Sequence, residues 1–258
     1  MFKDTSVWWV GLLVFIIFLS VNLILFLLRN KPKIAYAIIY CVAVYFLVLK
    51  TAEYVRWQVI GRHLHFPVEI SALSYFIFGI TVVFRIKKLN AFASFIAIIA
   101  GLVYSVTFWF VPENFTDGNF HRYLVMAIIN HHLLYFGGVT YANIEKYEWK
   151  KFYVVLFGVA ALIAYSWAIH LFTNYTVVEG KPIIIEITDG TILSHVFPSY
   201  STAIKILYIV CAIILFFALL VGFYCLNALM AKSRKSKGLE ENLYPPSLKE
   251  AFTFKRNE

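Results

Sequence analysis

The chain has 258 residues, of which 61% are hydrophobic, 19% are aromatic and only 14% are charged, and its mean hydropathy is +0.76. A soluble domain carries about 25% charged residues, so this composition excludes soluble, disordered and disulfide-framework classes. The net charge of +9 indicates membrane orientation and contact with anionic lipid rather than binding to nucleic acid.

Seven continuous apolar segments follow one another along the chain, each about 20 residues long, which is enough to cross the hydrocarbon core as a helix. Helices are expected because a backbone inside the bilayer must satisfy its own hydrogen bonds, and because the apolar runs do not alternate as barrel strands do. The sequence predicts an all-α polytopic bundle of seven transmembrane helices over residues 1–231, followed by a cytoplasmic basic tail over 232–258. The predicted spans are Val7–Leu28, Ile34–Tyr54, Phe66–Phe84, Ala91–Val111, Tyr123–Tyr141, Phe152–Phe172 and Ile204–Met230.

The basic residues indicate the orientation of the bundle. Most of the 23 Lys and Arg residues follow the first, third, fifth and seventh spans. Because cytoplasmic connectors carry the excess of positive charge, the N-terminus is predicted outside and the C-terminus inside. We expect a multi-pass protein of a bacterial plasma membrane, with membrane lipids as its partners.

Polar side chains gather in the outer halves of four spans. His131 and His132 lie deep in the fifth span, Lys50 and Glu53 in the outer third of the second, and Glu69 one turn into the third. Ionisable groups within a membrane are costly and usually face the bundle interior or a wet cavity. Further polar residues predicted at this end are Arg56, Arg62, His65 and His170.

Helical spacing indicates which of these groups can meet. Residues three and four apart share a helix face, which places Glu53 beside Lys50 and, if the helix starts near Pro67, His65 beside Glu69. His131 and Tyr135 share a face of the fifth span by the same rule. The simplest packing directs polar groups of the second, third, fifth and sixth spans into one outward-facing cavity. The alternative is that they are interhelical hydrogen bonds that hold the bundle together.

Two chemistries are compatible with such a cavity. Acyl transfer needs a nucleophile beside a base, for which Ser71 and either His131 or His132 are candidates. Binding of a small anionic solute would instead use Lys50, Arg56 and Arg62, with the histidines relaying protons. No cofactor is expected, because the last span lacks a mid-span lysine for retinal and no tight ligand motif specifies a metal.

One short motif is similar to a known family. The run Phe66-Pro67-Val68-Glu69-Ile70-Ser71, an aromatic-rich span, the basic 85–88 connector and Asn130-His131-His132 together resemble the YwaF-like integral membrane proteins. Eukaryotic relatives are regarded as phospholipid acyltransferases, so the resemblance implies handling of a lipid or amphipathic substrate. In this sequence Glu69 stands where that family usually has a histidine, and Ser71 where it has the nucleophilic cysteine.

Three functional hypotheses stay open at this point. The first is an outward-facing polar cavity that handles a lipid or amphipathic substrate, with acyl transfer as its concrete form. The second is a transporter or binding protein for a small anionic solute. The third is a non-catalytic membrane scaffold. The site residues proposed for them are Ser71, His131 and His132 as catalytic groups and Lys50, Glu53, Arg56, Arg62, His65, Glu69, Tyr135 and His170 as substrate-binding groups.

Overall fold

The computed structural model describes residues 8–60, 66–110, 121–173 and 201–238, and this part of the chain is almost entirely helical, without strands. The predicted all-α class is therefore confirmed. The helices are α1 (Trp8–Leu28), α2 (Pro32–Val59), α3 (Ile70–Val83), α4 (Asn90–Phe110), α5 (His121–Ile144), α6 (Phe152–Thr173) and α9 (Thr202–Ser236), with short 3₁₀ turns at Lys87–Leu89 and Trp149–Lys151 before α4 and α6.

Five of the described helices, namely α1, α2, α4, α6 and α9, are long and apolar enough to cross a membrane. Large apolar side chains are exposed on the surface of α9, where Leu207, Ile214 and Leu226 are about 60% exposed. An exposed apolar surface of this extent is expected to face acyl chains rather than water. The helices thus indicate a membrane protein, while α3 and α5 do not meet the same criteria of length and hydropathy.

The third predicted span is shorter than expected. Pro67 disfavours helical backbone at the residue before it, and the carbonyl of Val68 accepts a hydrogen bond from the Ser166 hydroxyl of α6 at 2.9 Å. The chain therefore stays non-helical until Ile70, and α3 has only 14 residues, about 21 Å of helix. The expectation of a helix beginning near Pro67 was wrong.

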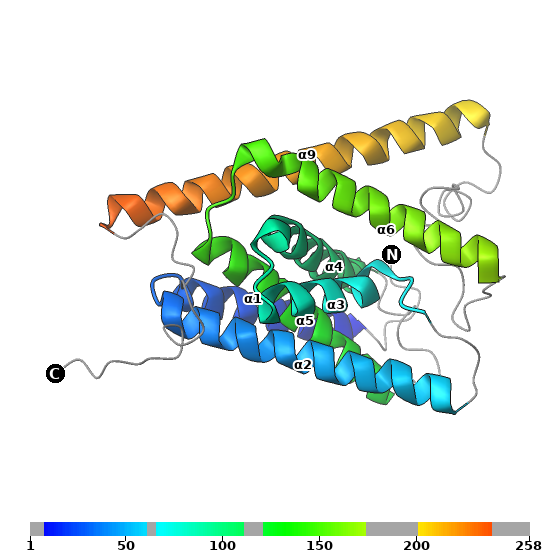
Figure 1. Cartoon of the computed structure of the whole chain (residues 1–258), viewed down its shortest axis with the longest axis horizontal. Coiled ribbons are helices and arrows are strands. Elements are labelled where there is room, and N and C mark those ends of the chain that lie inside the picture. Colours follow the sequence, from blue (N-terminus) through cyan, green and yellow to red (C-terminus); the bar gives the residue numbers. More distant parts are fainter. Residues whose placement is uncertain (1–7, 61–65, 111–120, 174–200, 239–258) are drawn as a thin grey trace.

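The fifth predicted span is long but polar, and its surroundings explain why. Helix α5 contacts α1, α2, α3 and α4, and near its end α9, so its polar residues face other helices. Figure 1 shows α6 and α9 on one side of the group formed by α1–α5. A polar helix is tolerated in a membrane when neighbouring helices provide its hydrogen-bond partners.

Close packing of α4 on α5 depends on two glycines. A Cβ added to Gly101 would lie 2.5 Å from the carbonyl oxygen of His131, and one added to Gly138 would lie 2.9 Å from the carbonyl oxygen of Ser94. The Ser94 hydroxyl in turn donates to the carbonyl of Gly138 at 2.6 Å. Small residues at these crossings let the two backbones approach, as is common between membrane helices.

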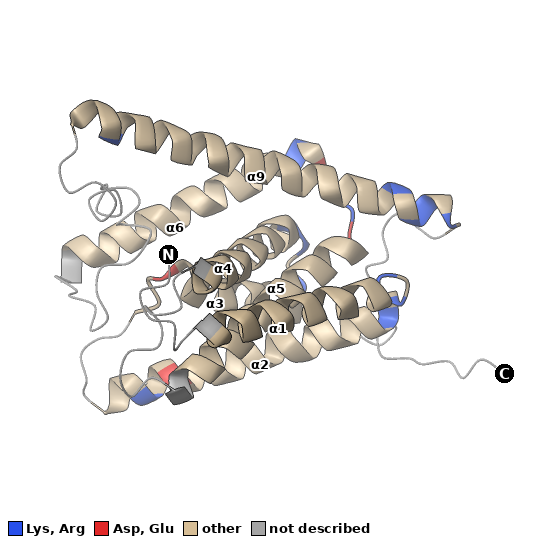
Figure 2. Ribbon diagram, turned by 180° about the vertical axis from the view of Figure 1, so that it is seen from behind, with Lys and Arg blue, Asp and Glu red and all other residues tan. Residues whose placement is uncertain are grey.

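Basic side chains gather toward the end of the bundle at which α1 and α9 stop, as Figure 2 shows. They lie in the α1–α2, α3–α4 and α5–α6 connections and in the last turns of α9. We call this the basic end, and the end at which α3 begins the opposite end. Helix α9 continues to Ser236, so the basic run that starts at Lys232 is helical rather than part of a separate tail.

Candidate functional site

Seven polar or aromatic side chains from four helices gather in the half of the bundle away from the basic end. We call it the polar network; it consists of Tyr45, Lys50 and Glu53 of α2, Tyr75 of α3, Tyr104 of α4, and Asn130 and His131 of α5. Glu53, Lys50, Tyr75, His131 and Tyr104 contact one another in series, and Tyr45 and Asn130 form a separate hydrogen-bonded pair. Lys50 of α2 is thus joined to His131 of α5 through Tyr75, whereas the residues predicted from α3, Glu69 and Ser71, are not among the members.

An ion pair lies at one side of the polar network. The Lys50 ammonium donates to the Glu53 carboxylate at 2.7 Å, one turn further along the same helix, and the two side chains are only 15% and 30% exposed. Lys50 Nζ also lies 4.9 Å from the centre of the Tyr75 ring. Contact with the face of an aromatic ring stabilises a desolvated ammonium group. Lys50 thus links the carboxylate of α2 to the buried tyrosine of α3.

His131 lies at the other side, enclosed by two tyrosines. The Tyr104 ring stacks on its imidazole with centroids 3.7 Å apart, and the Tyr75 hydroxyl lies 3.3 Å from its Nδ1. Nδ1 is also 2.8 Å from the carbonyl oxygen of Ala127. A carbonyl can only accept, so Nδ1 carries the hydrogen of the neutral ring, and Nε2 is the nitrogen that can take up a proton.

Asn130 of α5 forms a second contact with α2, through Tyr45. Its Oδ1 accepts a hydrogen bond from the Tyr45 hydroxyl at 2.9 Å, and its side chain is 3% exposed. Asn130 therefore forms an interhelical hydrogen bond between α5 and α2. The contact joins α2 to α5 next to His131.

His132 faces a different neighbour. Its Nδ1 donates to the carbonyl of Ile128 at 2.7 Å and its ring lies 6.4 Å from that of Phe18 on α1, centre to centre. Within the described ranges its Nε2 is buried without a hydrogen-bond partner. Consecutive helix positions are rotated by about 100°, so the tandem histidines cannot both face α3. The two residues therefore do not form one site.

Tyr135 also turns away from the polar network. Its hydroxyl donates to Oδ1 of Asn22 on α1 at 3.0 Å. The spacing predicts that His131 and Tyr135 share a face of α5, but the two side chains contact different helices. Tyr135 contacts α1, whereas His131 contacts α3 and α4.

Other predicted site residues lie outside the polar network. Glu69 is the residue immediately before α3 rather than one turn inside it, and Ser71 is half-buried in the first turn, without a hydrogen bond to either histidine in the described part of the chain. Arg56 is exposed and lies beyond the Lys50–Glu53 ion pair on α2. His170 lies on α6 with its ring 6.0 Å from that of Trp167. Arg62 and His65 fall outside the described residues.

Sequence reasoning did not find the three tyrosines. The sixth span was expected to contribute to the site, but Ser166 of α6 instead donates a hydrogen bond to the Val68 carbonyl. The fourth helix of the network is α4, which contributes Tyr104. Tyrosine is abundant here, with 17 copies, so no single one stands out. A usable signal was that Tyr75 follows Ser71 by four residues on the stripe of α3 that faces the bundle.

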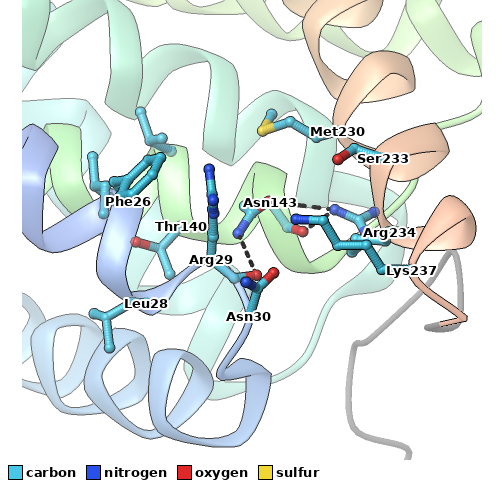
Figure 3. A pocket seen from close by; sticks show the side chains of 12 residues that line it. Phe26, Leu28, Arg29, Asn30, Thr140, Asn143, Met230, Ser233, Arg234 and Lys237 are labelled. Carbon is cyan, nitrogen blue, oxygen red and sulfur yellow. Dashed lines mark hydrogen bonds between the residues drawn. The ribbon is translucent and has the colours of Figure 1, made fainter.

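A cavity of about 270 Å³ lies at the basic end, between α1, α5 and α9. We call it the basic-end cavity; Figure 3 shows it with Arg29, Asn143, Arg234 and Lys237 around it. The cavity predicted from sequence was placed instead among the polar residues near the opposite end, where the polar network lies.

Over the described ranges, no group of three His, Cys, Asp or Glu side chains is placed to hold a metal ion. Comparison with known proteins found no matching family model, no matching curated protein and no matching solved structure. The function must therefore be argued from the geometry of the chain itself.

Proposed function

We propose that the protein is a seven-span plasma-membrane transporter or binding protein for a small anionic solute, in which the polar network couples anion binding to proton uptake. The observation that carries this proposal is that the Lys50–Glu53 ion pair connects through Tyr75 to His131. The N-terminus would be outside and the C-terminus inside. The basic connections at one end of the bundle support this orientation (Figure 2).

The chemistry follows from the charges. An incoming anion can replace the Glu53 carboxylate as the partner of Lys50, and the displaced carboxylate then loses its ion pair on α2. One proton taken up for each monovalent anion bound keeps the net charge of the site unchanged, which avoids the cost of placing an additional charge in the membrane.

Tyr75 and His131 supply the path for that proton. When Nε2 of His131 accepts a proton, the Nδ1–H can pass to the Tyr75 hydroxyl oxygen, 3.3 Å away, while that hydroxyl releases its own hydrogen toward the carboxylate displaced from Lys50. Tyr104, stacked on the imidazole, holds the ring in place during this exchange. Membrane proteins that move protons commonly use carboxylates and histidines in such chains.

The test is anion uptake by the full chain reconstituted in liposomes, with an inward proton gradient. Benzoate and inorganic phosphate serve as probes. Tyr75→Phe keeps the ring beneath Lys50 and removes only the hydroxyl, and His131→Phe keeps an aromatic ring for Tyr104. Both variants are expected to bind the anion within about twofold of wild type and to lose about tenfold or more of gradient-driven uptake, since each loses a hydrogen bond worth ~1.4 kcal/mol to the proton path.

The matched control is Lys205→Gln, which removes a cation from the first turn of α9, outside the polar network. It should leave uptake unchanged, whereas Lys50→Gln should abolish both binding and uptake. Equal uptake by wild type and Tyr75→Phe, or equal losses in the Lys50 and Lys205 variants, would contradict the proposal.

The same preparations test the acyl-transfer hypothesis. Incubation with labelled phospholipid should give no transfer of the acyl chain if the protein is a transporter. Transfer that disappears in Ser71→Ala, with anion uptake absent from the wild type, would establish the enzyme instead.

A further inference from the structure

The basic-end cavity brings three cationic side chains together from two helices that are far apart in sequence. Arg29 follows the last residue of α1, Arg234 lies in the last turn of α9, and Lys237 is the residue after that helix. Among the described residues that line the cavity, none carries a carboxylate. Three positive charges around one small volume repel each other, and an anion between them would offset that repulsion.

Asn143 of α5 fixes the position of this basic group. Arg234 donates through Nη1 to the backbone carbonyl and the side-chain oxygen of Asn143, and Nδ2 of Asn143 donates to the carbonyl of Arg29 at 3.4 Å. Figure 3 shows Asn143 between the two arginines. These contacts orient a guanidinium that is only 4% exposed, but the amide brings no negative charge.

The remaining walls divide into a polar part and an apolar part. Ser233 and Asn30 offer hydrogen-bonding groups beside the cations. Leu25, Phe26 and Met230 form an apolar side, on which the Arg29 guanidinium lies 3.7 Å from the centre of the Phe26 ring. The volume of about 270 Å³ is enough for a phosphate group and the atoms next to it. Phe26 is 55% exposed, so the apolar side opens toward the surface where lipid chains would lie.

We propose that the basic-end cavity binds a phosphate-bearing anion, with Arg29, Arg234 and Lys237 as the groups that contact its oxygens. Guanidinium groups match phosphate geometry with paired hydrogen bonds, and basic pockets between membrane helices at the cytoplasmic side suit anionic headgroups. The phosphate can belong to an anionic phospholipid or to a soluble compound. This inference is independent of the polar network and of the proposed transport.

The competing explanation is that these cations only stabilise helix ends and set orientation. Lys and Arg near a helix C-terminus interact favourably with the helix dipole whether or not a ligand is present. The two explanations differ in one respect. A binding site requires the particular side chains that line the cavity, whereas a general basic surface responds equally to any lysine of the same helix end.

The experiment measures dissociation constants of the detergent-purified full chain for three probes: short-chain phosphatidylglycerol, short-chain phosphatidylcholine and inorganic phosphate. Arg29→Gln and Lys237→Gln are the test variants, because both side chains are exposed and their loss should not disturb folding. Lys232→Gln is the matched control, since it removes the same charge from an exposed position of α9 that does not line the cavity.

Phosphatidylglycerol should bind at least tenfold more tightly than phosphatidylcholine, and each test variant should weaken it about tenfold, the effect of one charge-assisted hydrogen bond. The control should stay within twofold. Binding of inorganic phosphate with the same variant pattern would also support the site and would identify its source as a soluble phosphate. Equal weakening of phosphatidylglycerol binding by Lys232→Gln would overturn the proposal. So would a failure of the wild type to bind either phosphatidylglycerol or inorganic phosphate.

Discussion

Asn227 is the side chain whose removal should most weaken the attachment of α9. It is 1% exposed and makes three hydrogen bonds at the end of α5. Its Oδ1 accepts from the backbone N–H of Tyr147 at 2.8 Å, and its Nδ2 donates to the carbonyls of Ala142 and Glu145 at 2.7 Å each. Carbonyls at a helix C-terminus have no hydrogen-bond donor within the helix, so the Asn227 amide supplies the donor for the carbonyls at the end of α5.

Asn227→Ala should lower the free energy of unfolding by about 2–3 kcal/mol. Polar contacts between membrane helices contribute ~0.6 kcal/mol on average, and hydrogen bonds in proteins generally ~1 kcal/mol, so three of them give this range. The measurement is reversible unfolding in mixed detergent micelles with added dodecyl sulfate, followed by tryptophan fluorescence. Asn22→Ala is the control, because Asn22 accepts one interhelical hydrogen bond, from Tyr135.

The Asn227 variant should lose two to three times as much stability as the Asn22 variant, in proportion to the interhelical hydrogen bonds removed. A loss below ~0.5 kcal/mol, or one no larger than that of Asn22→Ala, would refute the reasoning that this amide satisfies buried backbone groups.

Three further predictions concern packing and pH. Gly101→Ala should cost about 2–3 kcal/mol in the same unfolding assay, because its Cβ would lie 2.5 Å from the backbone of His131, which cannot move alone; unchanged stability would mean that α4 and α5 separate easily. Burial raises the pKa of Glu145, outside the spans, to about 7. The folded chain therefore holds a proton that the unfolded chain releases near pH 4.5, and stability should fall by about 3 kcal/mol as pH rises from 4.5 to 7; Glu145→Gln should remove that slope, and an identical slope in the variant would contradict the assignment. Ser166→Ala should speed hydrogen exchange over 66–70 by freeing the Val68 carbonyl, and unaltered exchange there would show that Pro67 alone fixes the segment.

The sequence predicts the helices well and their neighbours poorly, for different physical reasons. Apolar runs of bilayer length specify a helix regardless of what surrounds it, so α1, α4 and α6 begin and end within two residues of the predicted spans. The predicted ends failed where a tertiary contact decides, as at Val68, whose hydrogen bond to Ser166 delays the start of α3.

When a helix is apolar on most sides, its hydrophobic periodicity does not show which other helix packs against each of its faces. The spacing correctly placed Lys50 beside Glu53, since that pairing is local to α2. It gave no means of choosing α4 rather than α6 as the partner of His131, because stacking on Tyr104 is a contact between distant segments. The basic-end cavity was missed for the same reason, since Arg29 and Arg234 meet only through the packing of α1, α5 and α9.

The most direct test of the central claim is the number of protons taken up when the anion binds, measured with a pH indicator in weakly buffered detergent solution. The Lys50–Glu53 exchange predicts about one proton for each benzoate bound by the wild type, and none for Glu53→Gln, in which the displaced group cannot be protonated. Proton uptake that is absent from the wild type, or the same in both proteins, would contradict the coupling of anion and proton through this network.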